Sequence, residues 1–108
     1  MMNLMKDREQ AFESAYQQKQ EQERKKTYRR NRLFAKWVSD ELNLKGEQAE
    51  ELEKIIFLSD LEEPGDDDIL RTTIAQMKAH GVEVDKATLE RRLEHFMTRA
   101  GKQDDSPP

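Results

Sequence analysis

The most constraining feature of this sequence is a long stretch that favours helix but has very little to bury. No glycine or proline occurs before Gly46, so no helix-breaking residue interrupts this part of the chain. Yet the segment 17–27 (QQKQEQERKKT) has no apolar side chain, and Phe12 and Tyr16 are isolated among charged residues upstream of it. A helix-prone segment without a core of its own is typical of a helix that forms on a partner. We therefore expect the N-terminus to be the working part of the molecule.

The composition predicts one small domain. The chain has 108 residues, of which 39% are charged and 34% hydrophobic. Without the polar N-terminal part, about 70 residues remain to build a core, which is near the lower limit for a domain that folds alone. The absence of cysteine excludes disulfides and thiol chemistry. No apolar run approaches the length of a membrane span, so we expect a cytoplasmic protein without membrane insertion.

Charge is distributed unevenly, although the net charge is only −4. Residues 24–32 carry six basic side chains and no acid, whereas residues 40–68 carry twelve acids against Lys45 and Lys54, a net of −10. A basic stripe beside an acidic body either steers a charged partner or forms ion pairs within the molecule.

Helical periodicity predicts an all-α fold, a small four-helix bundle with a mobile, helix-prone N-terminal segment. The glycines and Pro64 separate the periodic stretches, and the predicted helices cover approximately 20–42, 47–61, 67–80 and 86–100. The corresponding organisation is a flexible N-terminal segment at 1–19, a four-helix domain at 20–100 and a disordered tail at 101–108.

Residues at the predicted helix ends have typical capping roles. Asp66 and Asp85 precede the third and fourth helices as N-caps, and Gly81 is suited to a left-handed C-cap. Val84 and Leu89 have the spacing of a hydrophobic staple. The residues predicted to face inward are Leu33, Phe34, Trp37, Val38, Leu42, Ala49, Leu52, Ile55, Ile56, Ser59, Ile69, Leu70, Ile74, Met77, Leu89, Leu93, Phe96 and Met97.

Residues suited to catalysis or metal binding are sparse. His80 and His95 have no second histidine or cysteine at ligand spacing and no serine in a triad-like context. The acids at 62–68 (EEPGDDD) are consecutive, unlike the alternating ligands of a calcium loop, and we interpret them as helix-start residues. We predict no enzymatic activity, no metal and no other cofactor.

The sequence gives less support for binding nucleic acid or nucleotides than for binding a protein partner. Tyr28 and Phe34 near the basic range 24–32 could stack on bases, but the chain is acidic overall and lacks a nucleic-acid-binding motif, so we expect no nucleic acid. Because there is no glycine-rich phosphate loop, weak adenine nucleotide binding would need a shallow pocket between helices. Two alternatives stay open, a helical adaptor that uses the bundle surface and a small nucleotide-sensing protein.

Several motifs together resemble one family. DREQAFE at 7–13, RRN at 29–31, Leu33, Trp37 and EEPGDDDILR at 62–71 occur along nearly the whole chain. With this set the chain resembles the zeta subunit of the alphaproteobacterial F-type ATP synthase, an inhibitor of ATP hydrolysis. Each motif alone is weak, and the ordered combination is specific.

The resemblance implies a mechanism and a set of contact residues. In that family the N-terminal segment inserts as a helix at a catalytic interface between the alpha and beta subunits, next to gamma, and blocks rotation. The bundle docks outside, so the protein is expected to be peripheral to the membrane-bound ATP synthase. The predicted inhibitory contacts are Met5, Asp7, Arg8, Glu9, Ala11, Phe12, Glu13 and Tyr16, and Arg29 and Arg30 are predicted as a secondary partner contact.

Overall fold

Four helices account for nearly all of the structure. The computed structural model describes the backbone of residues 4–60 and 65–103, and the side chains of residues 15–60 and 65–102. Within these residues there is no strand, which confirms the predicted all-α class. No described helix combines the length and the apolar run that crossing a bilayer requires. The helices are α1 (Leu4–Glu41), α2 (Glu47–Ser59), α3 (Asp67–Ala79) and α4 (Lys86–Gln103).

The first helix is longer than its apolar stripe. It begins at Leu4, whereas the sequence analysis placed its start near Gln20. The upstream residues are mostly Gln, Glu, Lys, Arg and Ala, whose intrinsic helix propensity favours continuation of the helix beyond the apolar stripe. The flexibility expected for residues 1–19 stays a prediction.

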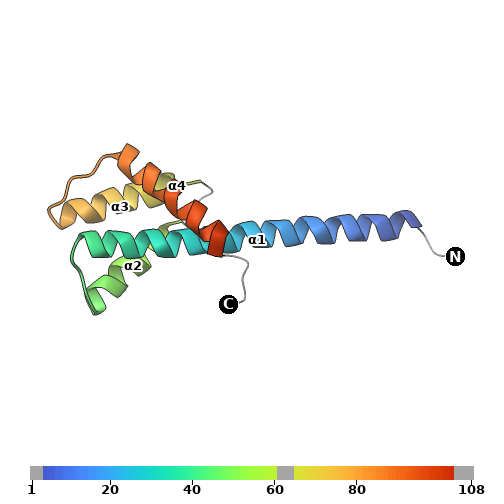
Figure 1. The fold of residues 1–108 in the computed structure, drawn as a ribbon, viewed down its shortest axis with the longest axis horizontal. Helices are drawn as coiled ribbons and strands as arrows, with labels where there is room; N and C mark the ends of the chain where they lie inside the picture. The colour runs from blue at the N-terminus through green and yellow to red at the C-terminus, as the bar shows by residue number, and fades with distance from the viewer. Residues whose placement is uncertain (1–3, 61–64, 104–108) are drawn as a thin grey trace.

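The molecule is elongated because only half of α1 is covered. Its extents are 69 × 33 × 25 Å. In Figure 1, α2, α3 and α4 gather around the C-terminal half of α1, and the N-terminal half projects alone. The 38 residues of α1 correspond to about 57 Å at the rise of an α-helix.

The core lies where α1 is covered, and it draws on all four helices. Each helix contributes apolar side chains at the spacing that the sequence predicts. Leu33, Trp37, Leu42, Leu44, Ile74 and Val84 are partly buried and pack against it. The fully packed cluster consists of Phe34, Ala35, Val38, Leu52, Ile56, Ile69, Leu70, Met77, Leu89, Leu93 and Phe96.

One predicted core position on α2 is wrong. Ile55 is 38% exposed, although it was expected to face inward. The buried arc of α2 is centred on Leu52, Ile56 and Ser59, and Ile55 lies outside it because successive helix positions are rotated by about 100°. α2 also ends at Ser59 rather than near Leu61, and Asp60 is its C-cap.

Two of the predicted helix ends are confirmed by their hydrogen bonds. The Asp85 carboxylate accepts a hydrogen bond from the Thr88 backbone N–H at 3.0 Å, which is N-cap geometry. Gly81 has a φ of 82°, and the Val82 N–H donates to the Met77 carbonyl at 2.9 Å. This is the Schellman arrangement, in which a left-handed residue ends a helix.

The third predicted cap differs. Asp66 occupies the N-cap position of α3, but its side chain makes no capping hydrogen bond. Its carboxylate instead accepts hydrogen bonds from Arg30 of α1. A carboxylate at a helix start still stabilises the positive end of the helix, so the residue keeps that part of the predicted role.

The C-terminal helix also runs further than predicted. The tail was expected to begin at residue 101, yet α4 continues through Gly101 to Gln103. A Cβ built on Gly101 would lie 3.1 Å from Cε of Lys26, which is near the end of a flexible side chain of α1. The rest of the predicted tail, 104–108, lies outside the described residues.

Candidate functional site

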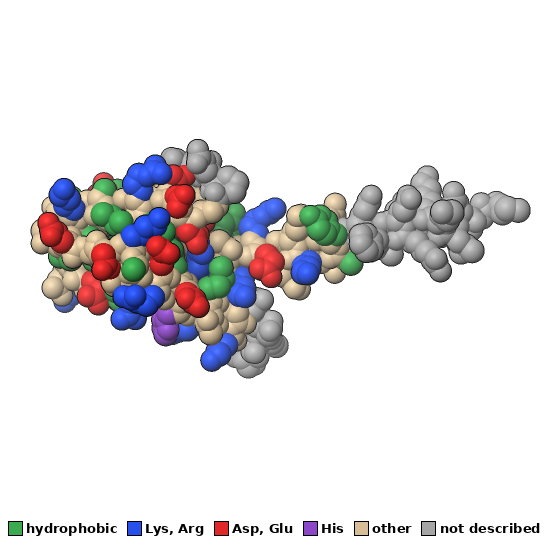
Figure 2. Space-filling model, turned by 90° about the horizontal axis from the view of Figure 1, so that it is seen from above, with side chains coloured by type: hydrophobic (Ala, Val, Ile, Leu, Met, Phe, Trp, Pro, Cys, Tyr) green, Lys and Arg blue, Asp and Glu red, His purple; other side chains and the backbone are tan. Residues whose placement is uncertain are grey.

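The projecting half of α1 is the first candidate site. All side chains from Ala15 to Lys25 are exposed, and Tyr16 is 59% exposed. The polar side-chain contacts described for this stretch lie within α1 itself. The Tyr16 hydroxyl accepts a hydrogen bond from Gln20 Nε2 at 2.9 Å, the Glu23 carbonyl accepts one from the Thr27 hydroxyl at 3.0 Å, and Lys25 pairs with Glu21 at 3.8 Å. We call residues 4–25 of α1 the rod. Figure 2 shows that the part of the rod with described side chains stands clear of the bundle. The segment therefore has a surface available to a partner on every side.

The predicted inhibitory residues all lie on this rod. Tyr16 is placed with its side chain, and it is exposed. Because the backbone from Leu4 onwards is α-helical, residues spaced by four or seven positions share one face, as do Met5, Phe12 and Tyr16. The other predicted residues are on the helix backbone, and their side chains lie outside the described part: Met5, Asp7, Arg8, Glu9, Ala11, Phe12 and Glu13.

A buried polar cluster holds α1 at the point where it leaves the bundle. We call Arg30, Asn31, Asp60 and Asp66 the junction network. Arg30 and Asn31 are 5% and 1% exposed, and they are the first buried side chains of the described part of α1. Asp60 ends α2 and Asp66 begins α3, so the network joins three helices.

Hydrogen bonds within the junction network are short and mutually supporting. Nη2 and Nη1 of Arg30 donate to the two carboxylate oxygens of Asp66 at 2.9 and 3.3 Å. Nη2 and Nε of Arg30 also donate to Oδ1 of Asn31 at 2.8 and 3.0 Å. The Asn31 amide in turn donates to Asp60 at 2.7 Å, and Asp60 lies 3.8 Å from Nη2 of Arg30. A buried guanidinium needs such partners, since an unpaired buried charge is strongly destabilising.

The surroundings of Arg29 and Arg30 bear on the secondary partner contact that was predicted for them. The sequence analysis predicted a secondary partner contact at Arg29 and Arg30, but Arg30 is enclosed and bound within the molecule. Arg29 is partly buried, and its Nε donates to the Ala100 carbonyl of α4 at 3.3 Å. Both arginines thus hold helices together, which argues against a direct contact of Arg30 with a partner.

Sequence reasoning missed the junction network as a unit. It placed Asp66 as a cap and Arg30 in a basic stripe, and it did not assign Asn31 or Asp60. A usable signal was present, because Arg30 precedes Phe34 by one helical turn and Asn31 precedes Val38 by two turns on the inward face. Polar residues on that face need buried partners, and acids at nearby helix ends can supply them.

Burial raises the pKa of the Asp60 carboxyl above its ordinary value of 3.8, and this effect outweighs the hydrogen bond from Asn31 and the charge of Arg30. Folding therefore favours the protonated form. The stability that this group contributes is present below pH 3.8 and is lost as the pH rises through the raised pKa. For Asp85 the sign is opposite, because hydrogen bonds from Thr88 lower its pKa.

We expect Asp60→Asn to remove a pH-dependent step from the unfolding curve. Relative to the variant, the wild type should lose stability as the pH rises from 3.8 through the raised pKa of Asp60. Urea unfolding followed by Trp37 fluorescence over a pH series measures this difference. Asp85→Asn is the matched control, against which the wild type should gain stability as the pH rises towards 3.8. Parallel curves for the wild type and Asp60→Asn would contradict the assignment.

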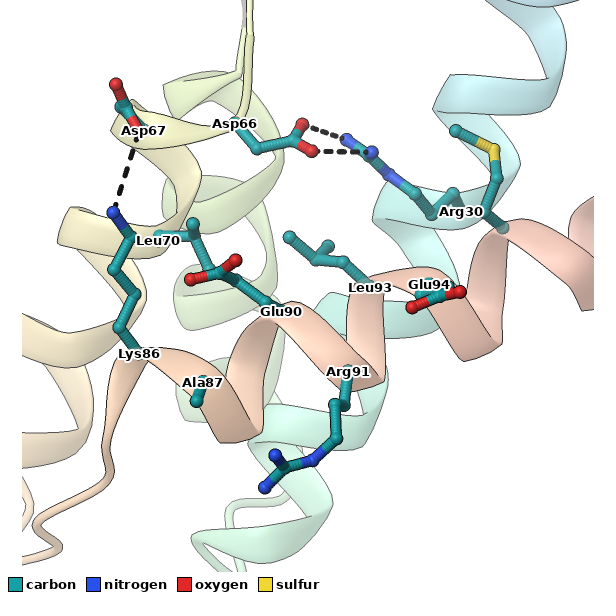
Figure 3. A pocket seen from close by; sticks show the side chains of 11 residues that line it. Arg30, Asp66, Asp67, Leu70, Lys86, Ala87, Glu90, Arg91, Leu93 and Glu94 are labelled. Carbon is teal, nitrogen blue, oxygen red and sulfur yellow. Dashed lines mark hydrogen bonds and ion pairs between the residues drawn. The ribbon is translucent and has the colours of Figure 1, made fainter.

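Two surface grooves flank the junction. A groove of about 650 Å³ lies between α3 and α4, with Leu70 and Leu93 among its apolar residues. Figure 3 shows Asp66, Asp67, Glu90 and Glu94 around it, while Arg91 points away. The lining is mixed in charge, because Arg30 and Lys86 also line the groove and pair with Asp66 and Asp67. A second groove of about 690 Å³ lies between α1 and α2, and it includes Tyr28, whose ring centroid is 5.7 Å from that of Phe57.

The remaining candidates have structural roles. Nδ1 of His80 lies 2.9 Å from the Gln76 carbonyl, and His95 packs edge-on against Phe96. Trp37 is part of the core rather than a ligand wall, with Phe34 at 5.9 Å and the Arg92 guanidinium 5.0 Å over its ring. Among the described residues, no group of His, Cys, Asp and Glu is arranged to hold a metal ion.

Comparison with known proteins identified a family. The family model described as ATPase inhibitor subunit zeta matches residues 2–103, which covers both the projecting rod and the bundle. Neither the curated proteins nor the solved structures gave a match.

Proposed function

From the premise that this chain belongs to the ATPase inhibitor subunit zeta family, we propose that it inhibits ATP hydrolysis by the F-type ATP synthase through the N-terminal half of α1. The chain acts as a non-enzymatic plug at the catalytic head. In this proposal the rod inserts at an interface between the alpha and beta subunits, next to gamma, and obstructs rotation in the hydrolysis direction. The bundle stays outside the interface, and the protein is peripheral to the membrane.

The observation that carries the proposal is a solvated rod on a packed bundle. A helix normally buries one face, but the described side chains of α1 from Ala15 to Lys25 are all exposed. An isolated helix of this kind is marginal in water, so a groove in a partner would stabilise it. The family match extends across this segment as well as across the bundle, which supports a common role for both parts.

The energetics of insertion are favourable if the aromatic anchors are buried. Full burial of Phe12 is worth about 1.5–3 kcal/mol, and Tyr16 contributes on the same face. Coupled folding of a disordered segment costs about 2–5 kcal/mol. A rod that already favours helix lowers that ordering cost, because less conformational freedom is lost on binding.

We expect Phe12→Ala to raise the half-maximal inhibitory concentration by about 10- to 150-fold, since the buried ring is lost. The measurement is a titration of ATP hydrolysis by the cognate ATP synthase. Gln18→Ala is the matched control, because Gln18 is exposed and lies on the side of α1 opposite to Tyr16. Equal inhibition by Phe12→Ala and the wild type would exclude Phe12 as an anchor and favour an adaptor that uses the bundle surface.

A further inference from the structure

The junction network lies at the base of the projecting rod. From Ala15 to Lys25 every side chain is exposed, whereas Arg30 and Asn31 are buried. On the α2 and α3 side, the polar cluster is the first buried contact of α1 among the described residues, and it follows the half-exposed contact of Tyr28 with Phe57 of α2. In Figure 3, Arg30 reaches from α1 to Asp66 at the start of α3.

A second set of contacts holds α1 from α4. Nε of Arg29 donates to the Ala100 carbonyl in the last turns of α4. The Lys26 side chain lies against Gly101, where a Cβ would be only 3.1 Å from its Cε. α1 is thus held by α4 at Arg29 and by the ends of α2 and α3 at Arg30 and Asn31.

Polar contacts at this position constrain direction more than apolar packing does. Apolar burial is non-directional, whereas the paired hydrogen bonds of a guanidinium to a carboxylate fix both distance and angle. Phe12 is 18 positions from Arg30, about 27 Å along a helix, so a tilt of about 10° at the junction displaces it by about 5 Å. A displacement of that size is comparable with one helical turn.

We propose that the junction network aims the inhibitory rod, and that Arg30 is a positioning residue for inhibition. This inference rests on the proposed function of the rod. Arg30 does not touch the ATP synthase; its bonds to Asp66 and Asn31, together with the bond from Asn31 to Asp60, set the direction in which α1 leaves the bundle. A rod that is already held in the binding direction loses less orientational freedom when it binds.

The test compares Arg30→Lys with Arg32→Lys. Arg30→Lys keeps the charge but loses the two-pronged geometry, and Arg32 is an exposed arginine on the same helix. The chain has no cysteine, so spin labels can be introduced at chosen sites. One pair, Lys19→Cys with Lys78→Cys, reports the rod against the bundle, and a second pair, Gln48→Cys with Lys78→Cys, reports the bundle alone.

In the Arg30→Lys protein, the rod-to-bundle distance distribution should broaden while the distribution within the bundle stays unchanged. The half-maximal inhibitory concentration should rise by about tenfold, because apparent affinity falls with the fraction of molecules in the competent direction. Arg32→Lys should change neither quantity. Asp66→Asn should reproduce the effect of Arg30→Lys, since it removes the other half of the pair.

Distance distributions that match the wild type in both Arg30→Lys and Asp66→Asn would overturn the aiming role. Broadened distributions with unchanged inhibition would overturn the role of Arg30 as a positioning residue. If the wild-type protein itself does not inhibit, the proposed function fails, whereas the distance measurement still decides whether the network sets the direction of α1.

Discussion

A chain that lacks residues 1–18 is expected to keep a folded bundle and to lose its inhibition of ATP hydrolysis. The side chains of Ala15 to Lys25 are exposed, and the contacts of α1 with the other helices begin near Lys26. The described side chains that the deletion removes, those of residues 15–18, are all exposed, and the free energy of unfolding should change by no more than about 0.5 kcal/mol. Urea unfolding followed by Trp37 fluorescence measures that part of the prediction.

The functional effect of the same deletion should be large. It removes Phe12 and Tyr16 together, each worth about 1.5–3 kcal/mol when buried, which corresponds to a loss of affinity of about 100-fold or more. Stability and inhibition are thereby separated in one protein. A bundle that unfolds when residues 1–18 are removed would contradict this prediction.

At Phe34 we expect the opposite case, in which a substitution mainly lowers stability. Its side chain is fully buried, and its ring centroid lies 5.9 Å from that of Trp37. Phe34→Ala should lower the free energy of unfolding by about 3–5 kcal/mol, through lost burial and the cavity left behind. This is a large share of the stability of a small domain, which is typically about 5–15 kcal/mol.

Urea unfolding followed by far-UV circular dichroism is the suitable measurement for Phe34→Ala, because the substitution changes the surroundings of Trp37. Leu58→Ala is the control, since Leu58 lies on the outer face of α2 and is 45% exposed. A Phe34→Ala protein that loses no more stability than Leu58→Ala would contradict the assigned core.

The bundle was predictable because its information is local and periodic. Apolar residues at helical spacing identified Phe34, Leu52 and Leu89 as core positions. Helix ends were predictable where the residue has a single typical role at that position. Gly81 is the left-handed glycine that ends α3, and Asp85 is the N-cap of α4.

The junction network was not predictable in the same way. A carboxylate at a helix start can cap the helix or bind a distant cation, and the choice at Asp66 depends on Arg30, which lies 36 positions away in the sequence. For the same reason the sequence left open whether Arg30, as part of the basic stripe, meets a partner or forms an ion pair within the molecule. The length of α1 was misjudged because its helix is set by propensity, whereas the sequence analysis relied on the apolar stripe.

The central claim is that the projecting half of α1 is the inhibitory element. The most direct measurement is a parallel titration of ATP hydrolysis by the cognate ATP synthase with the full chain and with the chain that lacks residues 1–18. The account predicts that the full chain inhibits in a saturable manner and that the shortened chain, although folded, leaves the hydrolysis rate unchanged over the same concentrations. Equal inhibition by the two proteins would contradict it.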